Sequence, residues 1–277
     1  MSFLLLSHRG ACRQAPENTL AAFRLALEAG CHGSECDVQL SCDGALVVFH
    51  DETLERLTGQ KRAVPQLTWP ELATLRLRGT RAQADPAMIT PPPAEGFPLG
   101  TRVEDAASLR LASAGGGVIP TLEEVLRLHA SRHTYLFAEL KYFSEAHTPR
   151  KALGAAVITF ADTQQPNERF HVISFDEALV QWIKQLRPML RTGLVFDDRT
   201  RFARVQAACP SWADVLLPRA DCVDEALVAW AKEVGRPLYA WVADDEAAIE
   251  RLTQLGVDGV LTNEPSRLVA WAKRHGR

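Results

Sequence analysis

The sequence predicts an α/β protein, a distorted (β/α)8 TIM barrel, and three observations support this fold class. The chain has 277 residues, close to the roughly 250 that are typical of one such barrel. Short apolar runs alternate with helical patterns, and we count about eight such strand–helix units. No strand candidate is followed by a glycine-rich phosphate loop, which disfavours the alternative of an open doubly wound sheet.

The strand and helix candidates follow one another in a regular order. Phe3–Ser7 is the first strand candidate, and Thr19–Ala29 is the first helix. Gly33–Leu40 and Ala45–His50 are separated by too few residues for a crossover helix, so they should form an antiparallel hairpin. Further strands are predicted at Tyr135–Lys141, His171–Ser174, Thr192–Phe196, Val215–Leu217, Leu238–Val242 and Val257–Thr262. Further helices are predicted at Pro120–Ala130, Ala152–Asp162, Asp176–Gln185, Thr200–Ala208, Cys222–Val234, Ala247–Leu255 and Ser266–His275.

One segment interrupts this alternation. Arg78–Val118 contains Pro91–Pro93 and Gly115–Gly117 and has little periodicity, so we predict an inserted loop or small lid after the hairpin. The chain is otherwise predicted to form a single domain over residues 1–277.

The bulk composition narrows the functional classes. Hydrophobic residues make up 47% of the chain, enough for a large core, and the net charge of −3 does not favour nucleic acid as a partner. No run approaches the roughly 20 apolar residues that span a bilayer, so no stable membrane insertion is expected. Met1–Leu6 is interpreted as a buried strand and not as a signal peptide. The six cysteines form no CxxC pair, which favours reduced thiols and a cytoplasmic location.

Carboxylates occupy alternate positions on two predicted strands. Glu35 and Asp37 are two residues apart, so their side chains should point the same way. Two carboxylates on one face repel each other unless a cation lies between them, although a solvated strand face would also explain the pair. Glu139 has a similar position on a later strand. Because Mg²⁺ and Ca²⁺ prefer oxygen ligands, these three residues predict a site for one divalent metal ion, Mg²⁺ or Ca²⁺.

Histidines and cations end the same strands. His8 and His50 each close an apolar run, and Arg9 and Lys141 would lie nearby as anion-binding groups. Histidine gives or takes a proton near neutral pH, and a metal ion with cationic side chains stabilises the charge that develops on phosphate oxygens. The set matches the requirements of phosphodiester cleavage. Lys141 could instead form a purely structural salt bridge with Glu139.

The ordered motifs resemble the signature of the glycerophosphodiester phosphodiesterase family. Each motif alone is a weak signal, but their common order and spacing are specific and cover nearly the whole chain. The motifs are His8–Gly10, Pro16–Thr19, Glu35–Val38, Phe49–Asp51, Ile119–Leu126, Glu139–Lys141, Ser174–Phe175, Trp241 and Asp258–Thr262.

The resemblance implies hydrolysis of a small-molecule glycerophosphodiester to glycerol 3-phosphate and an alcohol. The general acid–base pair would be His8 and His50. The metal ligands would be Glu35, Asp37 and Glu139. The substrate contacts would be Arg9, Lys141, Glu17 and Trp241. The resemblance also suggests that the 2-hydroxyl of the substrate glycerol attacks phosphorus, which would give a cyclic phosphate that water then opens.

Alternatives remain at several positions. Glu17 could be a first-turn helix residue that the helix dipole favours, and Trp241 could be a core aromatic. Asp51 is interpreted as a residue that orients a loop, and Cys36 as a buried, inert thiol on the opposite strand face. Asn263 stands where the family usually has aspartate, so we expect a structural role there and not metal binding.

The alternative functions are a phospholipase-like diesterase that acts on lipids and a non-catalytic binding barrel. The sequence does not distinguish the leaving alcohol, the native metal or the oligomeric state.

Overall fold

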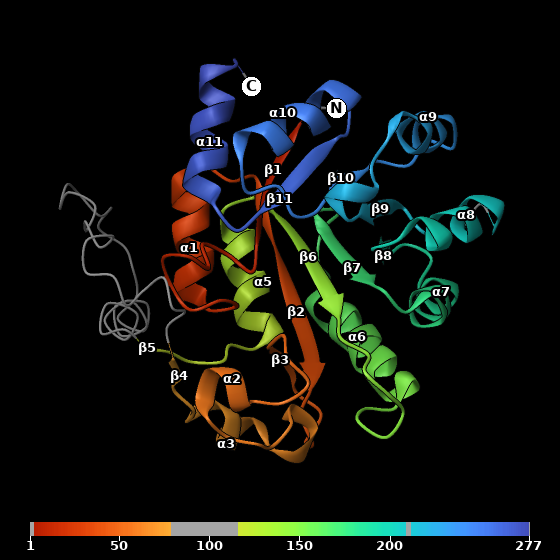
Figure 1. Ribbon diagram of the computed structural model, residues 1–277. Helices are drawn as coiled ribbons and strands as arrows, with labels where there is room; N and C mark the ends of the chain where they lie inside the picture. The colour runs from red at the N-terminus through yellow and green to blue at the C-terminus, as the bar shows by residue number, and fades with distance from the viewer. Residues whose placement is uncertain (1–2, 79–115, 209–211, 277) are drawn as a thin grey trace.

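Eight parallel strands form a nearly closed barrel, which confirms the predicted fold class. The computed structural model describes residues 3–78, 116–208 and 212–276. Isolated parallel bridges join Leu216 to Leu238 and Arg219 to Trp241, which brings the two ends of the strand sequence together. In spatial order the barrel strands are β10 (Tyr239–Ala240), β11 (Gly259–Thr262), β1 (Leu4–His8), β2 (Gly33–Leu40), β6 (Tyr135–Leu140), β7 (Phe170–Ser174), β8 (Arg191–Phe196) and β9 (Val215–Pro218) (Figure 1).

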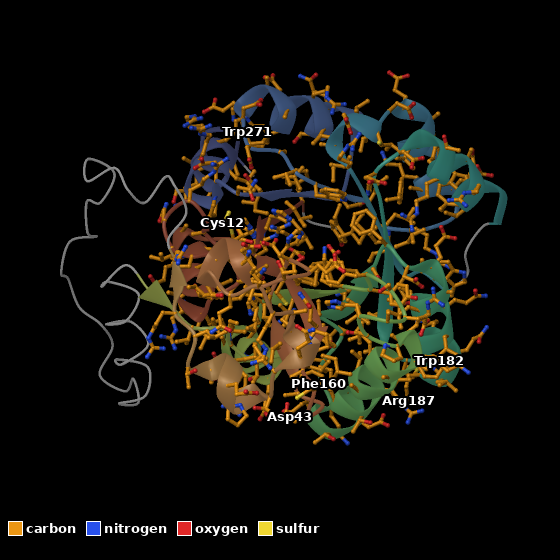
Figure 2. The ribbon with its side chains drawn as sticks, turned by 60° about the horizontal axis from the view of Figure 1, so that its bottom comes forward. Cys12, Asp43, Phe160, Trp182, Arg187 and Trp271 are labelled. Carbon is orange, nitrogen blue, oxygen red and sulfur yellow. The ribbon has the colours of Figure 1, made fainter. Side chains whose placement is uncertain are left out.

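Helices follow the strands and cover the outside of the barrel. All of them begin and end within three residues of the predicted bounds. They are α1 (Leu20–Ala29), α5 (Leu122–Ser131), α6 (Arg150–Gln164), α7 (Glu177–Leu186), α8 (Arg199–Ala208), α9 (Glu225–Glu233), α10 (Glu246–Leu255) and α11 (Pro265–Arg274). Figure 2 shows Trp182 of α7 and Trp271 of α11 far apart on this outer layer, with the strand side chains gathered between them.

Side-chain capping explains where several helices begin. Thr121 and Glu124 form a capping box at the start of α5, in which each side chain accepts a hydrogen bond from the other residue's backbone. Thr19, Asp176 and Asp245 cap α1, α7 and α10 in the same general way, by accepting from a backbone N–H of the first turn. These local signals were readable in the sequence, which is why the predicted helix bounds hold.

The strand faces divide the core into an inner and an outer layer. Inward positions of the strands form one apolar cluster, which fills the barrel below the carboxyl ends of the strands. This inner cluster contains Leu4, Leu6, Phe137, Ile173, Val195, Val215, Leu217, Tyr239 and Leu261. Outward positions pack against the helices, and Cys36 is fully buried there, where burial raises the pKa of its thiol. The prediction of a buried, outward-facing Cys36 is confirmed.

Gly33 allows β2 and β6 to lie close together at the start of the strand that carries two of the carboxylates. A Cβ atom at this position would lie 2.3 Å from the carbonyl oxygen of Tyr135. We expect Gly33→Ala to lower the free energy of unfolding by roughly 1–3 kcal/mol, because the two strands would have to separate. Urea unfolding of the purified variant measures this change, and wild-type stability would show that β2 and β6 adapt freely.

A small satellite structure follows the hairpin strand β3 (Leu46–Val48), which pairs antiparallel with β2 as predicted. The sequence assigned no element between His50 and Arg78, because the elements found there are too short to show periodicity. They are α2 (Glu55–Thr58), the 3-10 helix η1 (Val64–Gln66), α3 (Trp69–Ala73) and β4 (Leu77–Arg78). Their apolar side chains bury against Val47 and Phe49 in a separate cluster. Figure 1 shows α2 and α3 beside the carboxyl end of β2.

The two ends of the predicted insertion lie side by side. β4 pairs antiparallel with β5 (Gly116–Gly117), so Arg78 is opposite Gly116. The predicted loop or lid between them falls at residues 79–115, outside the described residues. Its role and the single-domain assignment remain predictions. A further short 3-10 helix, η4 (Ala220–Cys222), follows β9.

Within the described ranges, no helix combines the length and the apolar character that crossing a bilayer requires.

Candidate active site

Three buried carboxylates of β2 and β6 meet beside the carboxyl end of β1, where Glu35 pairs with His8. Asp37 pairs in register with Glu139, and Glu35 lies one inward position earlier on β2. One oxygen of each side chain lies within 4.8 Å of the others, and the three residues are between 0% and 8% exposed. The structure therefore brings together the three residues that the sequence singled out as metal ligands.

The electrostatics of this carboxylate cluster fit a bound cation. Burial and the neighbouring carboxylates raise the pKa of Glu35, and burial also raises the pKa of Glu139. Burial alone would raise the pKa of Asp37 too, but Arg9 and Lys141 outweigh it and hold that pKa below its ordinary value. Oε1 of Glu35 is buried and has no hydrogen-bond partner among the described residues. An unpaired carboxylate oxygen beside two other carboxylates is a donor set that suits Mg²⁺ or Ca²⁺.

Two cationic side chains border the cluster. Nε of Arg9 lies 3.0 Å from Oδ2 of Asp37, and Nζ of Lys141 lies 2.8 Å from Oε1 of Glu139 and 3.4 Å from Oδ1 of Asp37. Burial works against both cations, but the carboxylates overcome it and raise the pKa values of Arg9 and Lys141. The two cations do not balance the three carboxylates, so the centre keeps a net negative charge when all five groups are ionised. This net charge favours binding of a divalent cation.

His8 lies at the end of β1, beside the carboxylate cluster. Its Nε2 is 3.8 Å from Oε2 of Glu35, and its Nδ1 donates to Oδ1 of Asn263 at 2.8 Å. Burial and the neighbouring Arg9 lower the pKa of His8 to about 4. Through its side-chain oxygen, Asn263 orients the histidine ring, which is a structural contact of the kind expected for it.

His50 is held by a second network. Its Nδ1 donates to Oδ1 of Asp51 at 2.7 Å, and Arg56 donates to both oxygens of that carboxylate. Arg56 also donates to both oxygens of Glu17, at 2.6 and 3.0 Å. Glu17 thus lies with Arg9 and Arg56, and one of its oxygens lies within 4.8 Å of a potential ligand atom of His50 and of Asp51. Asp51 contacts the imidazole itself, a more direct role than the loop orientation expected from the sequence.

A pocket opens between these groups and the apolar side of the barrel. Its polar wall comes from His8, Arg9, Glu35, His50, Glu139 and Lys141. Its apolar wall comes from Ile173, Phe175, Val195, Leu217, Trp241 and Leu261. The Trp241 ring lies edge-to-face with Phe175 at 5.7 Å, and its Nε1 donates to the Leu217 carbonyl at 2.8 Å. The pocket can accept a ligand with one anionic end and one less polar end.

Sequence reasoning missed the residues that hold the site in place. Asn18 donates to Oδ2 of Asp37 at 2.7 Å and accepts from its backbone N–H. Gln39 donates to the carbonyls of Phe49 and Asp51, which fixes the loop that carries His50. Asn18 stands within a quoted motif and Gln39 continues the Glu35–Asp37 alternation, so both could have been noticed. Asp244 accepts a hydrogen bond from Nδ2 of Asn263 at 2.8 Å. Arg56 and Asp244 belong to no motif named above, and nothing in their local sequence indicated a role.

Comparisons with known proteins all lead to one family of enzymes. The model of the Glycerophosphoryl diester phosphodiesterase family matches residues 8–267. A glycerophosphodiester phosphodiesterase of Caldanaerobacter subterraneus is 29% identical over 276 residues, which cover 100% of both chains.

Solved structures are similar over nearly their whole length. A glycerophosphodiester phosphodiesterase from Agrobacterium tumefaciens has a TM-score of 0.71 at 24% identity, over 98% of this chain and 100% of the other. An Oleispira antarctica phosphodiesterase, solved in complex with the product sn-glycerol-3-phosphate, has a TM-score of 0.75 at 23% identity, over 97% and 96% of the two chains. These two structural similarities show that the chain has the same fold as both proteins.

Proposed function

The chain belongs to the glycerophosphoryl diester phosphodiesterase family and is an enzyme of that class, and we propose that it hydrolyses glycerophosphodiesters with a divalent metal ion and two histidines. The products would be glycerol 3-phosphate and an alcohol. One observation carries the proposal: the three carboxylates of β2 and β6 share one small volume, and His8 and His50 line the pocket beside it.

The side chains divide the work of phosphodiester cleavage among them. Arg9 and Lys141 would bind the phosphate, because both remain charged and face the pocket. His8 and His50 would exchange protons, one with the attacking hydroxyl and the other with the leaving oxygen. Trp241 would pack against the glycerol, and Glu17 would hold Arg9 and Arg56 in place beside the substrate.

The metal ion would be held by Glu35, Asp37 and Glu139. When bound, a divalent ion stabilises negative charge on phosphate oxygens and orients them. The ion would be Mg²⁺ or Ca²⁺, since the donors are all carboxylate oxygens.

Replacing one ligand should weaken metal binding without unfolding the chain. Glu35→Gln keeps the side-chain volume but removes a charge from the three-carboxylate cluster, so we expect at least about a tenfold loss of Mg²⁺ or Ca²⁺ affinity. Isothermal titration calorimetry measures this loss. Glu28→Gln, an exposed change on α1, is a matched control that should bind as wild type. Unchanged affinity in Glu35→Gln would contradict its assignment as a ligand.

The substrate class is tested with the purified protein and a panel of diesters. With Mg²⁺ or Ca²⁺ present, glycerophosphocholine or glycerophosphoethanolamine should release glycerol 3-phosphate, which a coupled dehydrogenase assay detects. Hydrolysis of phospholipid vesicles but not of soluble diesters would favour a lipid diesterase instead. No turnover of any diester would favour a non-catalytic binding barrel.

We also propose that the enzyme acts in the cytoplasm, in the metabolism of glycerol and lipid breakdown products.

A further inference from the structure

We infer that Asp244 is a positioning residue, which fixes the amide of Asn263 and thereby keeps Nε2 of His8 free to exchange a proton. The inference rests on the proposed role of His8 in the reaction. Asp244 follows β10, and Asn263 follows β11, the next strand of the barrel. The chain of contacts therefore runs from Asp244 through Asn263 to His8 across three neighbouring strands.

Asp244 contacts Asn263 through both carboxylate oxygens. Its Oδ1 accepts from the backbone N–H of Asn263 at 2.7 Å and from the hydroxyl of Thr262 at 3.0 Å. Its Oδ2 accepts from Nδ2 of the Asn263 side chain at 2.8 Å. These three hydrogen bonds hold the carboxylate in one orientation relative to the end of β11.

A carboxylate fixes which way an asparagine amide faces. The ionised group only accepts hydrogen bonds, so the NH2 group of Asn263 must face Asp244. The amide oxygen must then face the opposite way, toward His8. The thiol of Cys12 lies 3.3 Å from the same amide oxygen, as a donor does. Rotating the amide by 180° would place its oxygen against the Asp244 carboxylate and its NH2 against both donors.

The amide orientation in turn selects the tautomer of His8. Because Oδ1 of Asn263 only accepts, Nδ1 of His8 must carry the hydrogen in their 2.8 Å contact. The lone pair of the neutral ring is then on Nε2, which faces Glu35 in the pocket. Without Asp244 the amide would be free to rotate, and the ring could place its hydrogen on Nε2 instead. In that tautomer His8 has no acceptor on the side of the substrate.

Two single variants and their combination test the inference. In Asp244→Asn, the NH2 group of the new asparagine would face the NH2 group of Asn263, so the Asn263 amide should rotate. We then expect kcat to fall about 10²-fold and KM to change less than about threefold. In Asn263→Asp, two carboxylates would lie within 3 Å and repel each other, so kcat should fall as well. The double variant Asp244→Asn/Asn263→Asp restores one donor and one acceptor, so kcat should return to within about tenfold of wild type.

A spectroscopic measurement separates the tautomer from general damage to the fold. Long-range proton–nitrogen NMR of ¹⁵N-histidine protein, with the His8 signals assigned by their loss in His8→Ala, should show hydrogen on Nδ1 in wild type and on Nε2 in Asp244→Asn. The control Asp245→Asn makes the same chemical change one residue later, at an exposed helix cap that asparagine serves equally well, and should match wild type.

Three results would contradict the role of Asp244. Wild-type kcat in Asp244→Asn, hydrogen retained on Nδ1 in that variant, or a double variant as impaired as Asp244→Asn would each overturn the inference. The NMR measurement needs no turnover, so it tests the inference even if no diester proves to be a substrate. A lack of turnover would count only against the proposed function.

Discussion

Removal of the divalent ion is expected to abolish diester hydrolysis, the largest single effect that the site predicts. Glu35, Asp37 and Glu139 are buried together, and Glu35 has a buried oxygen without a hydrogen-bond partner among the described residues. Without a cation these groups repel each other, and this repulsion adds to burial in raising the pKa values of Glu35 and Glu139. No divalent ion would then stabilise the negative charge on the phosphate oxygens of the substrate.

The measurement is release of glycerol 3-phosphate from glycerophosphocholine before and after dialysis against EDTA. Activity should disappear and return when Mg²⁺ or Ca²⁺ is added in excess over the chelator. EDTA saturated beforehand with the same metal is the control and should leave the rate unchanged. Full activity after exhaustive chelation, with metal content verified by elemental analysis, would contradict a metal-dependent mechanism.

Loss of either pocket histidine should have the next largest effect. His8→Ala and His50→Ala should each lower kcat by about 10²–10⁴-fold, because each removes one proton-transfer group. The fold should survive, since His8 and His50 are partly exposed at strand ends and contribute little to the apolar core. Steady-state kinetics together with thermal unfolding measure both parts of this expectation.

His133→Asn is a suitable control for the histidine variants. His133 is exposed, lies outside the pocket and has a φ of 55°, a conformation that asparagine tolerates. Its rate should equal that of wild type. A near-normal kcat in His8→Ala or His50→Ala would remove that residue from the mechanism.

The sequence predicted the barrel well because its signals are local and repeated. Alternation along Glu35–Asp37 placed both carboxylates on one face, and the register of β2 with β6 brought Glu139 to the level of Asp37. Thr121 caps α5, which begins at Leu122, two residues from the predicted start at Pro120. The agreement of these signals with one another is what made the fold class readable.

The sequence did not reveal the residues that orient the site, because their contacts are long-range. Arg56 binds Glu17 across 39 positions, and Asp244 binds Asn263 across 19. No periodicity or spacing rule relates such pairs, and only the folded barrel brings them together. The short helices after β3 were missed for a different reason, since three to five residues are too few to show a helical pattern.

The two histidines are supported by different chemistry. Asp51 offers His50 a carboxylate that Arg56 fixes, whereas Asn263 offers His8 a neutral amide that Asp244 fixes. Both arrangements make Nδ1 the donor and leave Nε2 toward the pocket. The hydrogen-bond partner of Nδ1 is therefore a charged carboxylate in His50 and a neutral amide in His8.

The most direct test of the account is to locate the ion by anomalous diffraction from crystals grown with Mn²⁺, an oxygen-seeking substitute for Mg²⁺. A single peak at coordination distance from one oxygen each of Glu35, Asp37 and Glu139, roughly 2.0–2.4 Å, is the predicted result. A peak bound elsewhere, or a fully active crystal form in which these three carboxylates bind no ion, would contradict it.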